Sequence, residues 1–187
     1  SGELLLRKRQ PVLGGYDPAD YDQRRLWATA EDGTRIPISL VWKRSFGDPA
    51  DGPRPVHLYG YGSYEHSIDP GFSVARLSML DRGVVFAVAH VRGGGEMGRQ
   101  WYEDGKLLNK RNTFTDFVAV ARHLVEAGVT SPSQLVAEGG SAGGLLMGAV
   151  ANLAPELFAG ILADVPFVDA LTTILDPSLP LTVIEWD

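Results

Sequence analysis

The stretch LVAEGGSAGGLLMGAVAN, residues 135–152, decides the fold. Residues 135–137 are a short apolar run that predicts a strand, and the small-residue run at 142–152 predicts a helix. Between them lies GGSAG at 139–143, which matches the G-x-S-x-G pattern of a nucleophile elbow. The pattern therefore stands in the strand–turn–helix setting that its chemistry requires.

Ser141, at the centre of this turn, is the candidate nucleophile. A serine on so sharp a turn needs neighbours that are nearly free of side chains, and the surrounding glycines provide them. The helix that follows favours negative charge at its N-terminus, and the amide of Ala142 is placed to donate to an oxyanion. Two alternatives are a serine that only caps the helix and a phosphate-binding loop. The second lacks the lysine that would follow Gly144.

On both sides of the elbow in the sequence, short apolar runs alternate with segments of helical periodicity. Further strands are expected at residues 56–59, 84–90 and 161–163, and helices near residues 73–81 and 113–127. Two alternating runs, at residues 26–30 and 36–42, flank Asp32-Gly33, which is a strong hairpin signal. Strands that alternate with helices in this way predict an α/β fold, with a parallel-rich sheet flanked by helices.

The composition is that of an ordinary globular protein, with 44% hydrophobic and 21% charged residues among 187. A net charge of −6 gives no global attraction for nucleic acid or for an anionic membrane. No run approaches the ~20 apolar residues of a membrane helix. The absence of cysteine excludes disulfides, a thiol nucleophile and thiolate zinc sites, and it fits a reducing compartment. We therefore expect a cytoplasmic protein whose partners are neither nucleic acids nor membranes.

Four motifs occur in order along the chain: YGYGSY at 59–64, VRGGGE at 91–96, NTFTDF at 112–117 and GGSAGG at 139–144. Together they resemble the prolyl oligopeptidase family of serine peptidases, and the resemblance spans residues 10–187. Two more motifs, VPFVD at 165–169 and LTTILD at 171–176, are similar to the oligopeptidase B branch rather than to the proline-specific branch. The resemblance implies an α/β-hydrolase fold. It also implies cleavage of short basic peptides after Arg or Lys through an acyl-serine intermediate, with no metal and no organic cofactor.

The resemblance assigns roles within the catalytic centre. Ser141 matches the nucleophile, the backbone N–H of Ala142 matches one oxyanion-hole donor, and the hydroxyl of Tyr61 matches the second. A phenolic hydroxyl suits this task because it is a rigid, directional donor that is neutral at working pH. Without the resemblance, Tyr61 is interpreted as an aromatic ring that only packs in a loop. Residues 92–95 are expected to shape a tight loop under the site and to carry no chemistry.

Four residues match substrate-binding positions of the family. Glu185 and Asp187 match two acids that bind the substrate's P1 side chain, and carboxylates spaced in this way can converge on one guanidinium or ammonium. Asp187 stands where glutamate is usual, and the alternative for both acids is a solvated tail. Asp69 matches one acid of a subsite for a basic P2 residue, and Gly71 replaces its usual acidic companion. Tyr64 matches an aromatic residue that lines the pocket.

The order of the reactive groups departs from that of a complete α/β-hydrolase. In that fold the acid and then the histidine follow the serine along the chain. The four histidines of this sequence all precede the serine, at His57, His66, His90 and His123. We therefore expect a core or surface role for each. Without a base the serine hydroxyl stays protonated and weakly nucleophilic, so the chain alone is expected to be inactive.

The expected organisation is a C-terminally truncated hydrolase domain. Residues 1–25 are interpreted as the connector from a missing N-terminal β-propeller, and residues 26–187 as the N-terminal part of the catalytic domain. The expected partners are short basic peptides, together with the propeller and the C-terminal catalytic segment of the parent protein. Two other functions stay open. One is an esterase or acyl-aminoacyl peptidase of the same fold, which the paired acids disfavour, and the other is a non-catalytic fragment that binds basic peptides.

Overall fold

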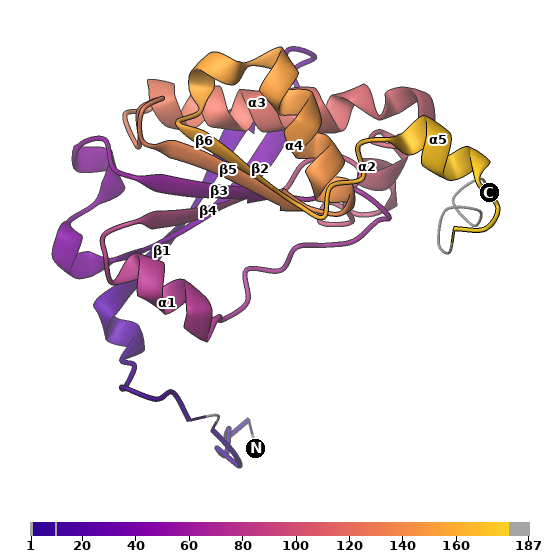
Figure 1. The fold of residues 1–187 in the computed structure, drawn as a ribbon. Coiled ribbons are helices and arrows are strands. Elements are labelled where there is room, and N and C mark those ends of the chain that lie inside the picture. Colours follow the sequence, from indigo (N-terminus) through magenta and orange to yellow (C-terminus); the bar gives the residue numbers. More distant parts are fainter. Residues whose placement is uncertain (1, 10, 180–187) are drawn as a thin grey trace.

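A computed structural model describes residues 2–9 and 11–179 of the chain. They form a six-stranded sheet with helices on both faces (Figure 1). The strands are β1 (Tyr21–Thr29), β2 (Arg35–Lys43), β3 (Val56–Gly60), β4 (Val85–Ala89), β5 (Leu135–Gly140) and β6 (Gly160–Asp164). The α-helices are α1 (Val74–Leu80), α2 (Arg99–Glu103), α3 (Arg111–Glu126), α4 (Ala142–Leu153) and α5 (Ala170–Leu175). Within this described part, none of the helices is long and apolar enough to cross a bilayer.

The sheet combines an antiparallel hairpin with a parallel block. Its strand order is β1-β2-β4-β3-β5-β6. The β1–β2 and β2–β4 pairs are antiparallel, whereas β4, β3, β5 and β6 are parallel neighbours. Helices connect the parallel strands: α1 lies between β3 and β4 in the chain, α3 between β4 and β5, and α4 between β5 and β6. The predicted α/β class with a parallel-rich sheet is confirmed.

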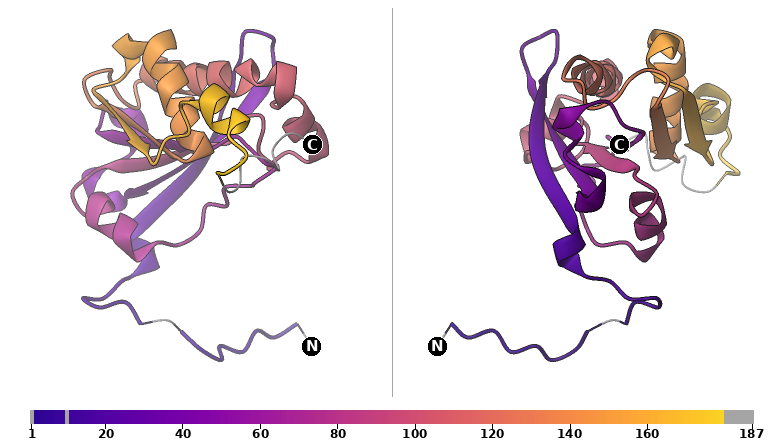
Figure 2. Two further views of the ribbon diagram at one scale, coloured as in Figure 1. Left: turned by 45° about the vertical axis from the view of Figure 1, so that its right-hand side comes forward. Right: turned by 90° about the vertical axis from the view of Figure 1, so that its left-hand side faces the viewer.

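The helices divide between the two faces of the sheet. α3 and α4 pack side by side on one face, and α1 lies on the other (Figures 1 and 2). Phe117, Val118 and Ala121 of α3 are buried, so an apolar face of this helix packs against the sheet. They share one core with Leu58 of β3 and Leu146 of α4. Burial stabilises each large side chain of this kind by roughly 1.5–3 kcal/mol, and it fixes α4 against the end of β5.

The β1–β2 hairpin turns where the sequence predicts, with Gly33 at a φ of 84°. The first strand, however, begins at Tyr21 rather than at Leu26. Its first half pairs with β2 through the backbone, from Tyr21 opposite Lys43 onward, while the side chains of residues 23–25 stay exposed. An exposed segment at a sheet edge has no apolar alternation, and the sequence pattern therefore missed it.

Two short helices were not predicted from the sequence. α2 is five residues long, and its Trp101 donates an indole hydrogen bond to the carbonyl of His90 at 3.2 Å. α5 is six residues long and follows Asp169, whose side chain accepts from the amide of Thr172 at 3.3 Å. Helices this short are marginally stable on their own, so tertiary contacts and capping bonds determine whether they form. The other predicted elements agree with the structure to within a few residues.

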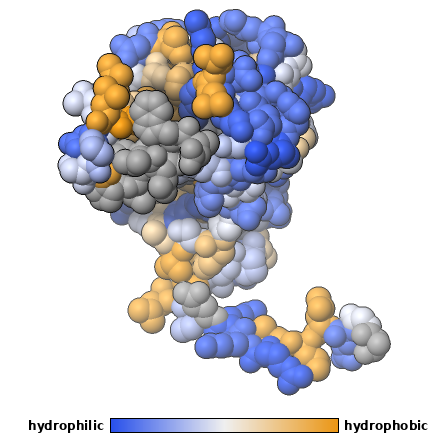
Figure 3. Space-filling model, turned by 90° about the vertical axis from the view of Figure 1, so that its right-hand side faces the viewer, coloured by the Kyte–Doolittle hydropathy of each residue, from blue (hydrophilic) through white to orange (hydrophobic). Residues whose placement is uncertain are grey.

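Apolar side chains stay exposed near the end of the described chain. Val165, Leu171 and Leu175 are between 64% and 84% exposed. The face that includes α5 accordingly shows separate apolar groups among polar ones (Figure 3). β6, which leads into this region, is an edge strand of the sheet, and its Leu162 is 50% exposed.

Candidate active site

Ser141 lies at the turn between β5 and α4. Its backbone has φ 56° and ψ −115°, outside the regions that residues with a side chain favour. The amide of Ser141 donates to the carbonyl of Asp164 at 2.9 Å. The carbonyl of Ser141 accepts from the amides of Gly144 at 2.9 Å and Phe167 at 3.1 Å. Such a conformation costs about 1–3 kcal/mol and persists only where the surroundings impose it, so the predicted sharp turn is present and strained.

Two of the three glycines in the GGSAG motif leave no room for a side chain. A Cβ on Gly139 would overlap the backbone of Gly143, and a Cβ on Gly143 would lie 2.8 Å from the carbonyl oxygen of Gly60. Gly140 differs, because a Cβ there would meet Asp164 only at 3.7 Å, an ordinary contact distance. The expectation that every neighbour of the serine must be nearly free of a side chain is therefore wrong for Gly140.

Ser141 is exposed at the N-terminus of α4 and does not cap this helix. A capping serine accepts a hydrogen bond from the second or third amide of its helix, and the Ser141 side chain makes no such bond. The interpretation of a purely capping serine thus has no support. Helix α4 is 12 residues long, and its first turn favours a developing anion beside the hydroxyl. Ala142 is the first residue of the helix, so its amide has no intrahelical acceptor.

Tyr61 packs against the same first turn of α4. It directly follows β3, and a Cβ on Gly143 would lie 3.4 Å from both the Cα and the Cδ2 atoms of Tyr61. The Tyr61 ring lies 6.4 Å from the ring of half-exposed Tyr64 and 5.5 Å from that of His66, between centroids. Because β3 and β5 are parallel neighbours, Tyr61 and the elbow emerge at the same carboxyl edge of the sheet. The structure therefore brings together Tyr61, Tyr64 and the elbow.

A half-buried lysine supports the loop that carries Tyr61. Lys110 Nζ donates to the carbonyl of Gly62 at 2.6 Å and to Ser63 Oγ at 2.7 Å. Burial lowers the pKa of Lys110 to about 8, because the charged form loses its hydration. The sequence analysis missed this residue, since a lysine just before a helix is most often a surface residue.

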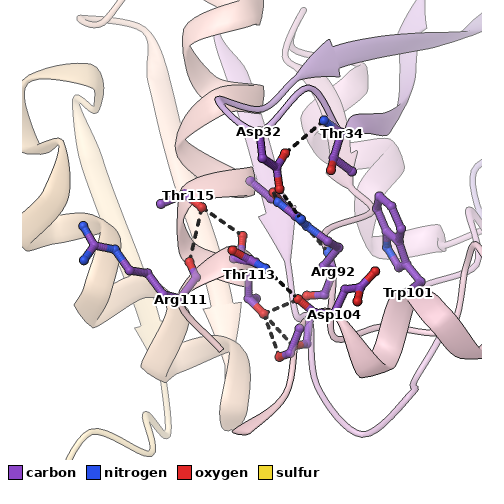
Figure 4. A network of polar contacts seen from close by, with 12 residues as sticks. Asp32, Thr34, Arg92, Trp101, Asp104, Arg111, Thr113 and Thr115 are labelled. Carbon is purple, nitrogen blue, oxygen red and sulfur yellow. Dashed lines mark hydrogen bonds and ion pairs between the residues drawn. The ribbon is translucent and has the colours of Figure 1, made fainter. Parts of the chain in front are cut away.

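Arg92 lies at the centre of a polar network (Figure 4). It is next to the loop that carries Tyr61, since a Cβ on Gly62 would lie 3.2 Å from the Arg92 carbonyl oxygen. Its guanidinium donates to Asp116 through Nε at 2.8 Å and Nη2 at 2.6 Å, and to Asp32 through Nη1 at 2.6 Å. Burial by itself lowers the pKa of Arg92, but the hydrogen bonds to the two carboxylates outweigh burial and raise it. The hydroxyl of Thr113 donates to the Arg92 carbonyl at 2.7 Å. Arg92 thus anchors the end of β4 to α3 and to the hairpin.

Asp69 lines a hollow of about 410 Å³ together with His90 and Glu96. His90 is buried, with Nε2 at 2.8 Å from Ser39 Oγ. Glu96 accepts a hydrogen bond at 3.0 Å from the amide of Ile68, which precedes Asp69. None of the described residues that line this hollow belongs to the elbow. The structure therefore does not bring Asp69 into contact with the candidate nucleophile.

The remaining predicted residues are placed as follows. Glu185 and Asp187 lie outside the described residues. His57 is buried in β3 and pairs with Glu138 of β5, and His123 is partly buried in α3. In the part of the chain that the structure describes, no group of three or more histidine or acidic side chains is placed to hold a metal ion.

The fold and the turn define a class of protein. A parallel-rich sheet flanked by helices, with G-x-S-x-G between a central strand and the next helix, is the arrangement of the α/β-hydrolases. The serine of the motif lies at the carboxyl edge of the sheet, as that class requires. Comparisons with known proteins narrow the class to one family.

A sequence model of the prolyl oligopeptidase family matches residues 70–187. Protease 2 from Moraxella lacunata is 54% identical over the whole of this chain, and dipeptidyl aminopeptidase BI from Pseudoxanthomonas mexicana is 55% identical, also over the whole chain. The structure of oligopeptidase B from Trypanosoma brucei, with covalently bound antipain, matches 92% of the chain with a TM-score of 0.88 and 56% identity. The chain belongs to the prolyl oligopeptidase family.

The chain spans about a quarter of the length of these relatives. It covers 27% of the Moraxella protein, 26% of the Pseudoxanthomonas protein and 24% of the T. brucei oligopeptidase B chain. The comparisons therefore show the family and the fold of this chain, and the activities named for the relatives are those of much longer chains.

Proposed function

We propose that this chain is the nucleophile-bearing part of a serine oligopeptidase that cleaves short peptides after Arg or Lys. The observation that carries the proposal is Ser141, an exposed serine held in a strained turn at a helix N-terminus without a capping bond. Family membership supports peptide hydrolysis. The similarity to oligopeptidase B supports the preference for basic residues.

In the proposed reaction Ser141 Oγ attacks the scissile carbonyl carbon while its proton passes to a histidine base. The carbonyl oxygen becomes an oxyanion, to which the Ala142 amide and the Tyr61 hydroxyl donate. The C–N bond then breaks, the base returns the proton to the leaving amine, and an acyl-serine remains. Water cleaves this ester by the same route. In α/β-hydrolases the acid and the histidine follow the serine, so we place both beyond residue 187 of the parent protein.

The proposed specificity rests on acidic side chains. Glu185 and Asp187 would bind the P1 guanidinium or ammonium. The bound cation would also relieve the repulsion between the two carboxylates. Asp69 is exposed in its loop and is proposed to face a basic P2 residue, with Tyr64 lining the path. A neutral acyl group gains nothing from these charges, which disfavours an esterase or an acyl-aminoacyl peptidase.

A second candidate function is the release of dipeptides from a free amino terminus. The observation that favours it is the relative from Pseudoxanthomonas mexicana, 55% identical over the whole chain, which is named a dipeptidyl aminopeptidase. The two functions share the serine chemistry. They differ in whether the substrate must carry a free amino group at a fixed distance from the cleaved bond.

The test uses a full-length protein in which residues 1–187 replace the aligned segment of Moraxella lacunata protease 2, called the chimera below. The chimera, its Ser141→Ala variant and the 187-residue chain alone are treated with a fluorophosphonate probe, and mass spectrometry locates the label. Substrates with Arg, Pro or acetyl-Ala at the cleaved bond are offered with blocked and with free amino termini.

Labelling of the chimera at Ser141, together with cleavage after Arg in blocked substrates, would support the proposal. Cleavage confined to substrates with a free amino terminus would replace it with dipeptide release. A chimera that neither labels nor cleaves, while unaltered protease 2 does both, would contradict it and favour a fragment that only binds basic peptides.

A further inference from the structure

The loop that carries Tyr61, residues 61–65 and called the Tyr61 loop here, has a strained backbone. Tyr64 and Glu65 have positive φ angles of 60° and 56°, which residues with a side chain adopt rarely. Gly62 has a φ of 70°, and a Cβ there would lie 2.7 Å from Val91 Cγ2. Local preference does not hold such a loop in place. Contacts from outside the loop must impose its conformation.

Lys110 makes two short contacts to the part of this loop that directly follows Tyr61. Its Nζ lies 2.6 Å from the carbonyl oxygen of Gly62 and 2.7 Å from Ser63 Oγ. The Thr113 hydroxyl also donates to the Gly62 carbonyl, at 3.5 Å, and the amide of Glu65 donates to the carbonyl of Gly93 at 3.1 Å. At the far end of the loop, Arg99 Nη1 donates to the exposed carboxylate of Glu65 at 2.6 Å. Hydrogen bonds from an ammonium are also about twice as strong as those between neutral groups. Lys110 is therefore the main clamp on the residues that directly follow Tyr61.

The Lys110 side chain is half-buried, and none of the described carboxylates forms an ion pair with its ammonium. Loss of hydration is the one cause of its lowered pKa, which at about 8 leaves the side chain charged at neutral pH. The Phe114 ring lies 5.9 Å away and contributes a weak cation–π contact. Two of the three ammonium donors are used on the Tyr61 loop. The charge of this lysine is thus directed at the loop rather than at an ion pair.

We infer that Lys110 is a positioning residue of the proposed oxyanion hole, one that fixes the Tyr61 loop so that the Tyr61 hydroxyl meets the carbonyl oxygen of the substrate. The inference rests on the proposed function and deepens it. Contacts run from Lys110 to Gly62, next to Tyr61 in the chain, and from Tyr61 to the first turn of α4. An oxyanion donor acts only in the correct position, so release of this clamp should impair the transition state more than substrate binding.

The test compares Lys110→Met with Lys106→Met in the chimera. Lys106 is the matched control, because it forms a partly exposed ion pair with Glu103 at 2.8 Å. We expect Lys110→Met to lower kcat by about tenfold to a hundredfold with KM changed by less than about twofold. The inhibition constant of an arginyl aldehyde, whose hemiacetal oxygen occupies the oxyanion hole, should rise by a similar factor. Lys106→Met should change none of these values.

A double-mutant cycle shows whether Lys110 acts through Tyr61. In a Tyr61→Phe background, Lys110→Met should change kcat by less than about twofold, because the donor that it positions is gone. If Lys110→Met lowers kcat by the same factor with and without Tyr61, the inference is overturned. If Lys110→Met fails to fold, Ser63→Ala removes one of the two lysine acceptors instead. It should lower kcat by a smaller factor, again only when Tyr61 is present.

The outcomes separate this inference from the proposed function. A chimera that cleaves after Arg, but whose kcat is indifferent to both Lys110→Met and Ser63→Ala, overturns the role of Lys110 alone. A chimera that does not react at Ser141 contradicts the proposed function, and the role of Lys110 falls with it.

Discussion

Ser141 holds a backbone conformation that its own chemistry disfavours, and its surroundings maintain it. The amides of Gly144 and Phe167 fix its carbonyl, and the carbonyl of Asp164 fixes its amide. Tyr64 and the residue after it share the same feature of positive φ. Strain of this kind gathers at functional sites because the fold must hold reactive groups in positions that local preference would not choose.

Glycine at position 141 should give a more stable protein than alanine. Glycine adopts positive φ without a steric penalty, whereas alanine keeps the strain of serine. The free energy of unfolding of the Ser141→Gly chimera should therefore exceed that of Ser141→Ala by about 1 kcal/mol. Thermal or urea unfolding of the two variants measures the difference, and neither should take up the fluorophosphonate. Equal stability, or a more stable alanine variant, would show that the turn is not strained.

Asp32 should make stability depend on pH in the acid range. The amide of Thr34 and, to a smaller extent, the guanidinium of Arg92 hold the pKa of Asp32 at about 2, below its usual 3.8. Because the pKa is lower in the folded state, this stabilisation is present above about pH 4 and is lost as the pH falls through about 2. Asp32→Asn should thus lower Tm at about pH 5, and the difference from the parent chimera should shrink toward pH 2.

Melting curves of both proteins between about pH 2 and pH 6 provide the measurement. Above about pH 5 the difference in Tm should be constant, which serves as the internal control. A difference that is equally constant down to pH 2 would contradict a lowered pKa for Asp32.

At the scale of elements, β5, the elbow and α4 were predictable because their signals are local. An apolar run, a cluster of glycines and a small-residue helix follow one another within residues 135–153. The helix α2 and the first half of β1 lack such signals, since a tertiary contact of Trp101 decides the first and backbone pairing decides the second. Local patterns cannot show either cause.

Some residues of the candidate site could likewise be predicted from the sequence, and others could not. Ser141 and Ala142 follow from the local pattern, and Tyr61 follows from family resemblance. The Arg92–Asp116 pair joins residues that are 24 positions apart, and the bonds from Lys110 reach 47 and 48 residues back along the chain. No spacing rule connects such residues, so only the folded chain shows which charges support the site.

The elbow should tolerate alanine at one glycine and not at another. Gly139→Ala places a methyl group into the backbone of Gly143 and should destabilise the chimera by about 2 kcal/mol or more, with loss of Ser141 labelling. In Gly140→Ala the new methyl group meets Asp164 only at an ordinary contact distance of 3.7 Å, so stability should change by less than about 0.5 kcal/mol, with labelling retained. Thermal unfolding and probe labelling of the pair measure both effects. Similar losses in the two variants would refute this steric account of the elbow.

At the scale of the whole molecule, the described chain has a well-packed core and, at one edge of the sheet, an exposed strand with exposed apolar side chains after it. The core between the sheet and the α3–α4 layer is fully buried around Leu58, Phe117 and Leu146. β6 lies at the edge of the sheet, and apolar side chains beyond it are exposed on the face that includes α5 (Figure 3). Among the described residues no strand pairs with the outer edge of β6. Such an edge next to exposed apolar groups is a template for association.

The polypeptide of residues 1–187, prepared by itself, should therefore self-associate. Size-exclusion chromatography with light scattering should give a mass that rises from low to high micromolar concentration. Leu162→Lys places a charge on the edge strand and should shift the population toward monomer, whereas Leu13→Lys, at a position 95% exposed far from β6 in the sequence, should not. A monomer that melts cooperatively at every concentration would contradict the prediction. It would mean that the core around α3 and α4 stabilises the fold without a partner for β6.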